Sequence, residues 1–186
     1  MKQGMPVYSY RPIGIIRSPY QDPAGMPVQS GGAAGIRGRV EVFGEFRAGL
    51  ADLDGFSRII LIYPFHRSEG YGLVVTPFLD KHPRGVFATR APRRPNAIGL
   101  SIVRLIGVEG GELAIEDVDI LDGTPLLDIK PYVPAFDAYP DERSGWLEGC
   151  DERLGSARSD GRFQRDSDRT RIAPGNHSVP GLGDPE

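Results

Sequence analysis

Cysteine is nearly absent from this chain, since Cys150 is the single one among 186 residues. An intrachain disulfide and a cysteine-based zinc site are therefore excluded. Long apolar runs are also missing: the longest aliphatic or aromatic run covers residues 59–63, against about 20 residues for a membrane-spanning helix. The opening residues, MKQGMPVYSYRPI, lack the apolar core of a signal peptide. We therefore expect a cytoplasmic protein in a reducing compartment.

Positive charge is not in excess. With 22 Lys and Arg residues against 25 Asp and Glu residues, the formal net charge is −3. A protein that holds nucleic acid by bulk positive charge is thus excluded, and binding of a polyanion would need a local basic patch. The Gly-x-Ser-x-Gly elbow, the P-loop and a Gly-x-Gly-x-x-Gly segment after a strand are missing too. A Rossmann cofactor site is therefore unsupported.

Glycine and proline are abundant instead, with 25 and 17 copies, so turns are frequent and long helices are scarce. Apolar residues mostly alternate with a period of two or form short β-branched runs, which is the pattern of strands. One helix is predicted at 45–53, where Phe46, Leu50 and Leu53 have spacings of four and three. Strands are predicted at 13–17, 38–43, 58–65, 73–77, 85–89, 100–108, 112–120 and 126–133.

Three local patterns refine this prediction. Residues 59–62 are apolar at every position, which indicates a central strand covered on both faces. Gly110 and Gly111 favour a tight hairpin turn, and a change in the parity of apolar positions predicts a bulge near residues 116–117. Seven or eight strands without strand–helix alternation favour an all-β fold, a small closed or partly open barrel with short helices, rather than a doubly wound sheet.

The composition changes near Cys150, because the residues that follow are mostly charged or Gly, Ser and Pro. Such a segment buries too little apolar surface to offset the entropy of ordering it. We therefore predict one barrel domain at residues 1–147 and a disordered tail at 148–186. The arginine-rich stretch 158–171 within this tail is either a solvated linker or an RNA contact.

A basic loop is the most unusual feature of the sequence. Between residues 81 and 94 the chain has no acidic residue and five basic ones, Lys81, Arg84, Arg90, Arg93 and Arg94. Guanidinium groups suit phosphate or carboxylate, and Pro92 and Pro95 reduce the entropy lost when a loop is held in a binding shape. Asn96 belongs to the same loop. The alternative is a solvated turn with surface arginines.

Two further polar groups have open interpretations. The segment Asp122-Gly123-Thr124-Pro125 is either a turn bonded to its own backbone or an acceptor and donor for a ligand. His66 and Arg67 directly follow the predicted buried strand, so His66 could be a base, an aromatic wall or a structural histidine. We expect no metal site, because His66 lacks a second histidine at ligand spacing.

Five blocks of sequence resemble the TsaA-like family in consistent order: RPIGIIRSPY (11–20), LDGFS (53–57), YPFHR (63–67), GVFATRAPRRPNAIG (85–99) and LDGTPLLDIKPYVP (121–134). The best-known members of this family are the TrmO tRNA methyltransferases. They use S-adenosylmethionine to methylate N6 of threonylcarbamoyladenosine beside the tRNA anticodon. The resemblance covers about residues 8–137 and implies a small β-barrel enzyme, a homodimer, that acts on tRNA.

The resemblance also implies roles for particular residues. The positions that match the family's cofactor contacts are Gln29, Ser30, Gly31, His66, Arg67, Arg90, Leu100, Asp122, Gly123, Thr124 and Pro125. Contacts to the tRNA substrate are expected from Lys81, Arg84, Arg93, Arg94 and Asn96. The sequence leaves the catalytic base unassigned, with Asp122 and His66 as the residues considered.

Two departures from the family pattern bear on function. Ala97 stands where the family usually has proline, so the loop loses one fixed φ angle. Longer bacterial members also carry an additional C-terminal domain. Two alternative functions therefore remain: a barrel methyltransferase acting on another RNA site or a small metabolite, and a non-catalytic RNA-binding module.

Overall fold

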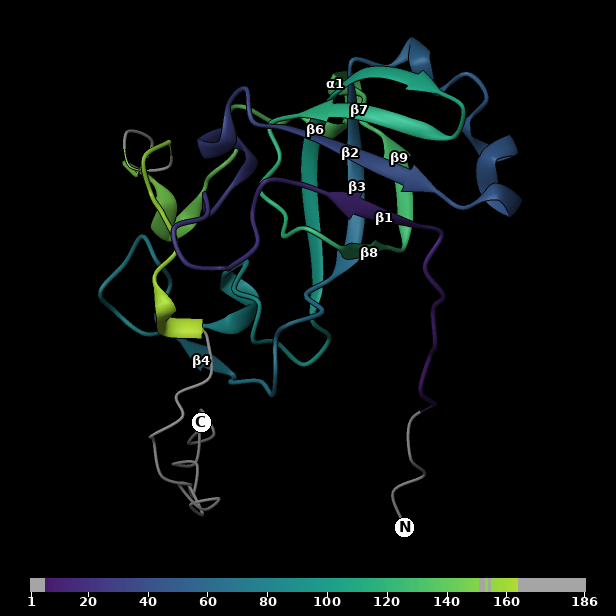
Figure 1. Ribbon diagram of the computed structural model, residues 1–186. Helices are drawn as coiled ribbons and strands as arrows, with labels where there is room; N and C mark the ends of the chain where they lie inside the picture. Colours follow the sequence, from purple (N-terminus) through teal and green to yellow (C-terminus); the bar gives the residue numbers. More distant parts are fainter. Residues whose placement is uncertain (1–5, 151–152, 154, 164–186) are drawn as a thin grey trace, which may run out of the picture.

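The computed structural model describes residues 6–150, 153 and 155–163. Strands predominate, and the helices are all short (Figure 1). The strands are β1 (Gly14–Arg17), β2 (Arg37–Val42), β3 (Arg58–Pro64), β4 (Val74–Val75), β5 (Arg84–Gly85), β6 (Ile98–Glu109), β7 (Glu112–Glu116), β8 (Thr124–Leu126) and β9 (Asp128–Pro131). The helices are α1 (Pro134–Asp137) and the 3-10 helices η1 (Ser30–Ala33), η2 (Gly44–Leu50), η3 (Leu53–Gly55), η4 (Val86–Ala88), η5 (Gly145–Leu147) and η6 (Gly161–Phe163). None of these described helices is long and apolar enough to cross a membrane.

Seven strands form one antiparallel sheet in the order β8-β1-β2-β7-β6-β3-β9. Its two outer strands, β8 and β9, are consecutive in the chain and are joined at Leu127, whose N–H donates to the carbonyl of Ile62 on β3 at 2.8 Å. The segment predicted as a single strand at 126–133 is thus divided between the two ends of the sheet. Because one short segment pairs with both β1 and β3, the sheet is nearly closed into a barrel.

The barrel interior is filled by alternate residues of each strand. On β3, Ile59, Leu61 and Tyr63 are buried, whereas Ile60 and Ile62 are only half-buried. The expectation that this strand is covered on both faces is therefore wrong. A strand of a closed antiparallel barrel has one face in the core and one on the outside, so apolar residues at every position do not require two covering layers.

Local predictions had mixed outcomes. Gly110 and Gly111 form the β6–β7 hairpin turn with φ of 58° and 94°. The bulge predicted near residues 116–117 is wrong, because β7 ends at Glu116 and the register shift of the β6–β7 ladder lies between Leu105 and Gly107. The parity of buried positions changes after Asp117, whose φ is 66°, so that Val118 is buried. The predicted helix at 45–53 is the 3-10 helix η2 followed by η3. The predicted strands 73–77 and 85–89 shrink to the two-residue strands β4 and β5, because this pair lies outside the barrel.

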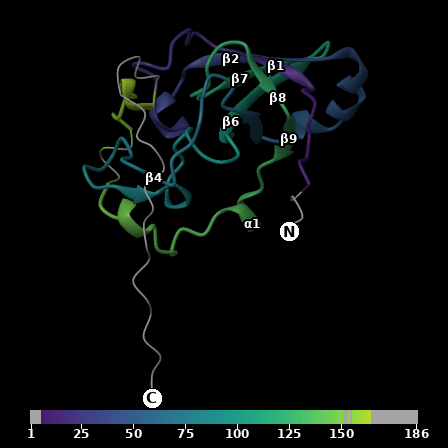
Figure 2. The ribbon, with the colours of Figure 1, turned by 90° about the horizontal axis from the view of Figure 1, so that it is seen from below.

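The chain after β9 runs through α1 and crosses to the side of β4 (Figure 2). There the indole N–H of Trp146 donates to the carbonyl of Ala88 at 2.7 Å. Of the tail predicted at 148–186, residues 151–152, 154 and 164–186 lie outside the described residues. Residues 155–163 contact two loops: Ser159 N–H donates to the Met26 carbonyl at 2.8 Å, and Phe163 packs edge-on against Phe78 with ring centroids 5.0 Å apart.

Candidate functional site

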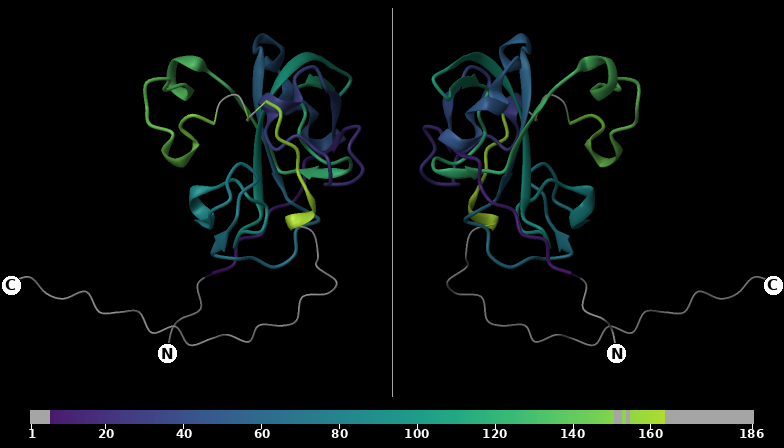
Figure 3. Two further views of the ribbon diagram at one scale, coloured as in Figure 1. Left: turned by 90° about the vertical axis from the view of Figure 1, so that its left-hand side faces the viewer. Right: turned by 90° about the vertical axis from the view of Figure 1, so that its right-hand side faces the viewer.

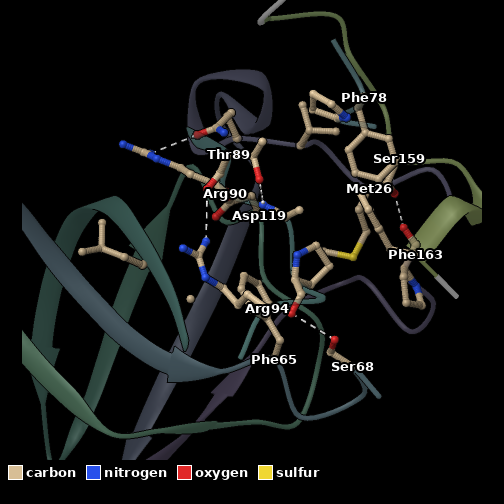
Figure 4. A pocket seen from close by; sticks show the side chains of 18 of the residues that line it. Met26, Phe65, Ser68, Phe78, Thr89, Arg90, Arg94, Asp119, Ser159 and Phe163 are labelled. Atoms are coloured by element: carbon tan, nitrogen blue, oxygen red, sulfur yellow. Dashed lines mark hydrogen bonds between the residues drawn. The ribbon is translucent and has the colours of Figure 1, made fainter. Parts of the chain in front are cut away.

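A cavity of about 1120 Å³ lies at one end of the barrel, where β3 ends and β6 and β8 begin. The loops of residues 70–97 gather at this end, away from the β6–β7 hairpin (Figures 1 and 3). The lining divides into two sides (Figure 4): Arg90, Arg94 and Asp119 lie together on one, and Met26, Phe78 and Phe163 lie on the other. This is the form of a small-molecule site, with apolar walls and a few polar groups.

A hydrogen-bonded chain of three residues reaches the cavity from the barrel core. Ser101 on β6 donates its hydroxyl proton to Asp119 Oδ1 at 2.6 Å, so the buried Tyr63 hydroxyl, 2.8 Å away, is the donor to Ser101. Burial raises the pKa of Asp119 to about 6, an increase opposed by Ser101 and by the charge of Arg90. Burial and the Asp119 carboxylate also raise the pKa of Tyr63. Asp119 is therefore a carboxylate that can exchange a proton near neutral pH.

His66 forms a second polar group at the cavity. Its Nδ1 lies 3.3 Å from the Thr124 hydroxyl, which already donates to the carbonyl of Leu121 at 2.7 Å. The histidine must then supply the proton at Nδ1, which leaves Nε2 as an acceptor. Burial, and next the neighbouring Arg67, lower the pKa of His66. A neutral imidazole is thus expected at pH 7.

Hydrogen bonds between side chains and backbone groups hold the basic loop in place. The Thr89 hydroxyl donates to the Val86 carbonyl at 2.8 Å and accepts from the Ala91 N–H at 3.2 Å. Arg94 donates to the Thr89 carbonyl at 3.1 Å, and Ser68 donates to the Pro92 carbonyl at 3.0 Å. These contacts hold the loop in shape without a proline at position 97.

Nine of the predicted site residues line this cavity: Gln29, Gly31, His66, Arg67, Arg90, Arg94, Asn96, Leu100 and Thr124. Arg90 and Gln29 are joined directly, with Arg90 Nη1 3.1 Å from Gln29 Oε1. The loop between β1 and β2 (residues 18–36, called the early loop) and the basic loop therefore meet at the cavity, although Gln29 and Arg90 are 61 positions apart in the chain.

Seven other predicted residues do not line it: Ser30, Lys81, Arg84, Arg93, Asp122, Gly123 and Pro125. Asp122 accepts from the Ser18 N–H at 3.1 Å, and Gly123 has a φ of 73° and donates its N–H to the Ile16 carbonyl; both contacts join this segment to the end of β1. Arg84 is held by Asp80 at 2.7 Å and lies over the Trp146 ring.

Several lining residues were not selected from the sequence. Tyr63 and Phe65 belong to the block 63–67, Asp119 lies just before the block 121–134, and Trp146 and Phe163 come from the segment after the barrel. No local pattern indicated Asp119, because the parity change that puts Val118 and Ile120 on the buried face predicts the opposite face for the residue between them. Nothing in the local pattern around Phe163 indicates a contact with Phe78. The described residues contain no group of three or more His, Cys, Asp or Glu that could hold a metal ion.

Residues 15–138 match the model of the tRNA-methyltransferase O N-terminal domain. The chain belongs to this family. A relative in Pyrococcus abyssi, named a probable S-adenosyl-L-methionine-binding protein, is 58% identical over 154 residues, which cover 83% of this chain and 84% of the relative. A mouse protein named tRNA (adenine(37)-N6)-methyltransferase is 38% identical over 134 residues, which cover 68% of this chain but 31% of the mouse protein.

Solved structures of family members have the same fold. The crystal structure of TrmO from Pseudomonas aeruginosa is similar with a TM-score of 0.64 and 41% identity, over 76% of this chain and 63% of that chain. A second TrmO crystal structure from this organism gives a TM-score of 0.66 and 40% identity, over 79% and 64% of the two chains. This chain therefore matches about two thirds of these members and less than a third of the mouse member.

Proposed function

We propose that this protein binds S-adenosylmethionine in the barrel-end cavity and transfers its methyl group to N6 of adenosine 37 in tRNA, with the threonylcarbamoyl-modified base as substrate. Membership of the TrmO family supports the chemistry. The observation that carries the proposal is the cavity itself, which joins His66, Arg90 and Asp119 with apolar walls at the ends of three strands.

The residues present fit the proposed cofactor. S-adenosylmethionine combines an adenine, ribose hydroxyls, a charged amino-acid end and a sulfonium. Phe65, Leu100 and Phe78 offer apolar surface for the flat and aliphatic parts, and Arg67 or Arg90 can meet the carboxylate. A cavity of about 1120 Å³ has room for the cofactor and a nucleobase together.

The bound cofactor would supply an electrophilic methyl group, so the protein's task is positioning. Correct alignment of nucleophile and methyl can lower a barrier by about 7–11 kcal/mol. Here the basic loop and Trp146 contribute side chains to the cavity lining, Arg94 among them, and Lys81 at the start of the same loop is exposed. We assign these cationic side chains to the tRNA backbone or to the carboxylate of the threonylcarbamoyl group.

The proposal includes a homodimer in the cytoplasm. Some apolar side chains outside the cavity lining are exposed, among them Ile106 on β6 and Phe136 on α1, which are 51% and 61% exposed. Exposed apolar side chains suit a partner surface, so a second copy of this chain is the expected partner. Sedimentation of the purified protein measures this state, and a monomer at all concentrations would contradict it.

The test uses purified protein, labelled S-adenosylmethionine and tRNA that carries or lacks the threonylcarbamoyl group. We expect label in the modified tRNA alone. Label in both tRNAs, or in a different RNA, would reject the threonylcarbamoyl substrate and retain the methyltransferase. The non-catalytic alternative predicts that S-adenosylmethionine leaves the melting temperature unchanged. The proposed function predicts a higher melting temperature, because a ligand that binds the native state must stabilise it.

A further inference from the structure

Asp119 is the one group of the Tyr63-Ser101-Asp119 chain that combines charge with a place in the cavity lining. It follows Val118, which is fully buried, so its backbone is anchored in the core. Ser101 occupies Oδ1, and a carboxylate has about four lone-pair sites in all. The remaining sites can accept a hydrogen bond from a ligand in the cavity.

The groups around Asp119 come from four parts of the chain. Arg90 of the basic loop is the cation that acts on its charge, and Tyr63 on β3 is a phenol whose pKa the Asp119 charge raises. Tyr20 of the early loop also interacts electrostatically with Asp119, and Ser101 on β6 is the direct donor. A single arginine beside a partly buried carboxylate leaves that group able to hold either charge state.

We propose that Asp119 is the proton acceptor for the target nitrogen during methyl transfer; this rests on the proposed function. The N–C bond to the methyl group forms as the C–S bond breaks, and the sulfur keeps the electron pair of that bond. The proton leaves N6 for the Asp119 carboxylate, which becomes a neutral carboxylic acid. The positive charge of the sulfonium and the negative charge of the carboxylate are both removed, so the step balances.

The other polar residues fit this role less well. Asp122 does not line the cavity and accepts from the Ser18 backbone. His66 lines the cavity, but it is more exposed than Asp119, and its Nδ1 is held by Thr124. Burial favours the neutral form of a carboxylic acid, so the environment of Asp119 favours its protonation. Its pKa of about 6 also leaves the acceptor form dominant at pH 7.5.

The experiment compares Asp119→Asn with the wild-type protein and with Asp128→Asn, a matched change on β9 that lies outside the cavity lining. We expect Asp119→Asn to retain cofactor affinity by calorimetry and to lose about 100-fold or more in single-turnover rate. Asp128→Asn should keep both values. In cofactor-free protein, carboxyl-carbon NMR should give one resonance that titrates near pH 6 and is missing from Asp119→Asn.

Loss of cofactor affinity in Asp119→Asn in parallel with the rate would make Asp119 a cofactor contact and overturn the proposal, as would an unchanged rate. If the wild-type protein methylates no tRNA, the proposed function is rejected, and the role of Asp119 is rejected with it. If the wild-type protein is active and Asp119→Asn keeps the same rate, only the role of Asp119 is rejected and the proposed function stands.

A second variant covers the case in which Asp119→Asn does not fold. Ser101→Ala removes a hydrogen bond that stabilises the ionised carboxylate, so the acidic limb of the rate profile should move to higher pH. A profile that does not move overturns the proposal.

Discussion

Gly99 on β6 lies directly against the phenol ring of Tyr63, its partner across the β3–β6 ladder. A Cβ atom at Gly99 would come within 2.7 Å of Tyr63 Cζ, closer than two such carbons can approach. The ring could not move without breaking the 2.8 Å contact between Tyr63 and Ser101. Glycine at this position therefore preserves the polar chain that ends at Asp119.

Gly99→Ala is expected to lower stability by about 2 kcal/mol and to reduce the methylation rate, because the displaced Tyr63 releases Ser101. Chemical denaturation and the single-turnover assay measure the two effects. Gly107→Ala is the control: it lies on the same strand, and a Cβ there meets nothing within 4 Å. Equal effects from both substitutions would show that β6 simply tolerates no added methyl group.

Asp117 fastens the end of β7 to two other parts of the chain. Its carboxylate accepts from the Gly35 N–H at 3.0 Å and from Arg58 at 3.0 Å, while its φ of 66° lies in the left-handed region. Asp117→Ala should cost about 2 kcal/mol in the free energy of unfolding, since it removes both acceptors and places alanine where it is strained. Asp117→Asn keeps the local geometry and should cost less; an equal loss would contradict this account.

The raised pKa of Asp119 has a consequence for stability. Between the ordinary value of 3.8 and about 6, the folded state binds a proton that the unfolded state has released, so the free energy of unfolding falls as the pH rises through this window. Asp119→Asn removes this loss of up to about 3 kcal/mol. Its melting temperature relative to wild type should therefore be higher at pH 7.5 than at pH 4. If the melting temperatures of variant and wild type differ by the same amount at both pH values, Asp119 does not titrate in this range.

Residues 158–163 link the two loops that border the apolar side of the cavity. Ser159 bonds Met26, and Arg162 donates to the Pro77 carbonyl at 2.8 Å. A chain ending at Ala157 should bind cofactor several-fold more weakly and exchange amide hydrogens faster at 23–29 and 76–79, because these loops lose their connection. A chain ending at Phe163 keeps every one of these contacts and serves as the control. Identical exchange in both truncations would reject the link.

The arginines of the basic loop should separate by role. Arg90→Ala is expected to lower cofactor affinity, since Arg90 lines the cavity beside Gln29. Arg93→Ala and Arg94→Ala should weaken RNA binding and each reduce its salt dependence by about one phosphate contact. Calorimetry measures cofactor affinity, and binding assays across a salt series measure RNA affinity. Arg37→Ala, at an exposed arginine outside the basic loop, is the control. Equal, salt-insensitive losses from all three would contradict the division.

The sequence by itself determined the strand content, the β6–β7 turn and the parity change at residue 117, because these depend on periodicity and on glycine's access to positive φ. It also located the basic loop and the blocks of the TrmO family, which depend on residue identity alone.

Tertiary structure decided which of these residues meet. The division of 124–131 between β8 and β9 follows from barrel closure, a long-range pairing that no local pattern encodes. The same closure directs Asp119 into the cavity and turns Asp122 towards the Ser18 backbone. Phe163 contacts Phe78, which lies 85 positions earlier in the chain. Such contacts arise from the packing of distant segments, so the place of Asp119 in the cavity could be recognised only from the tertiary structure.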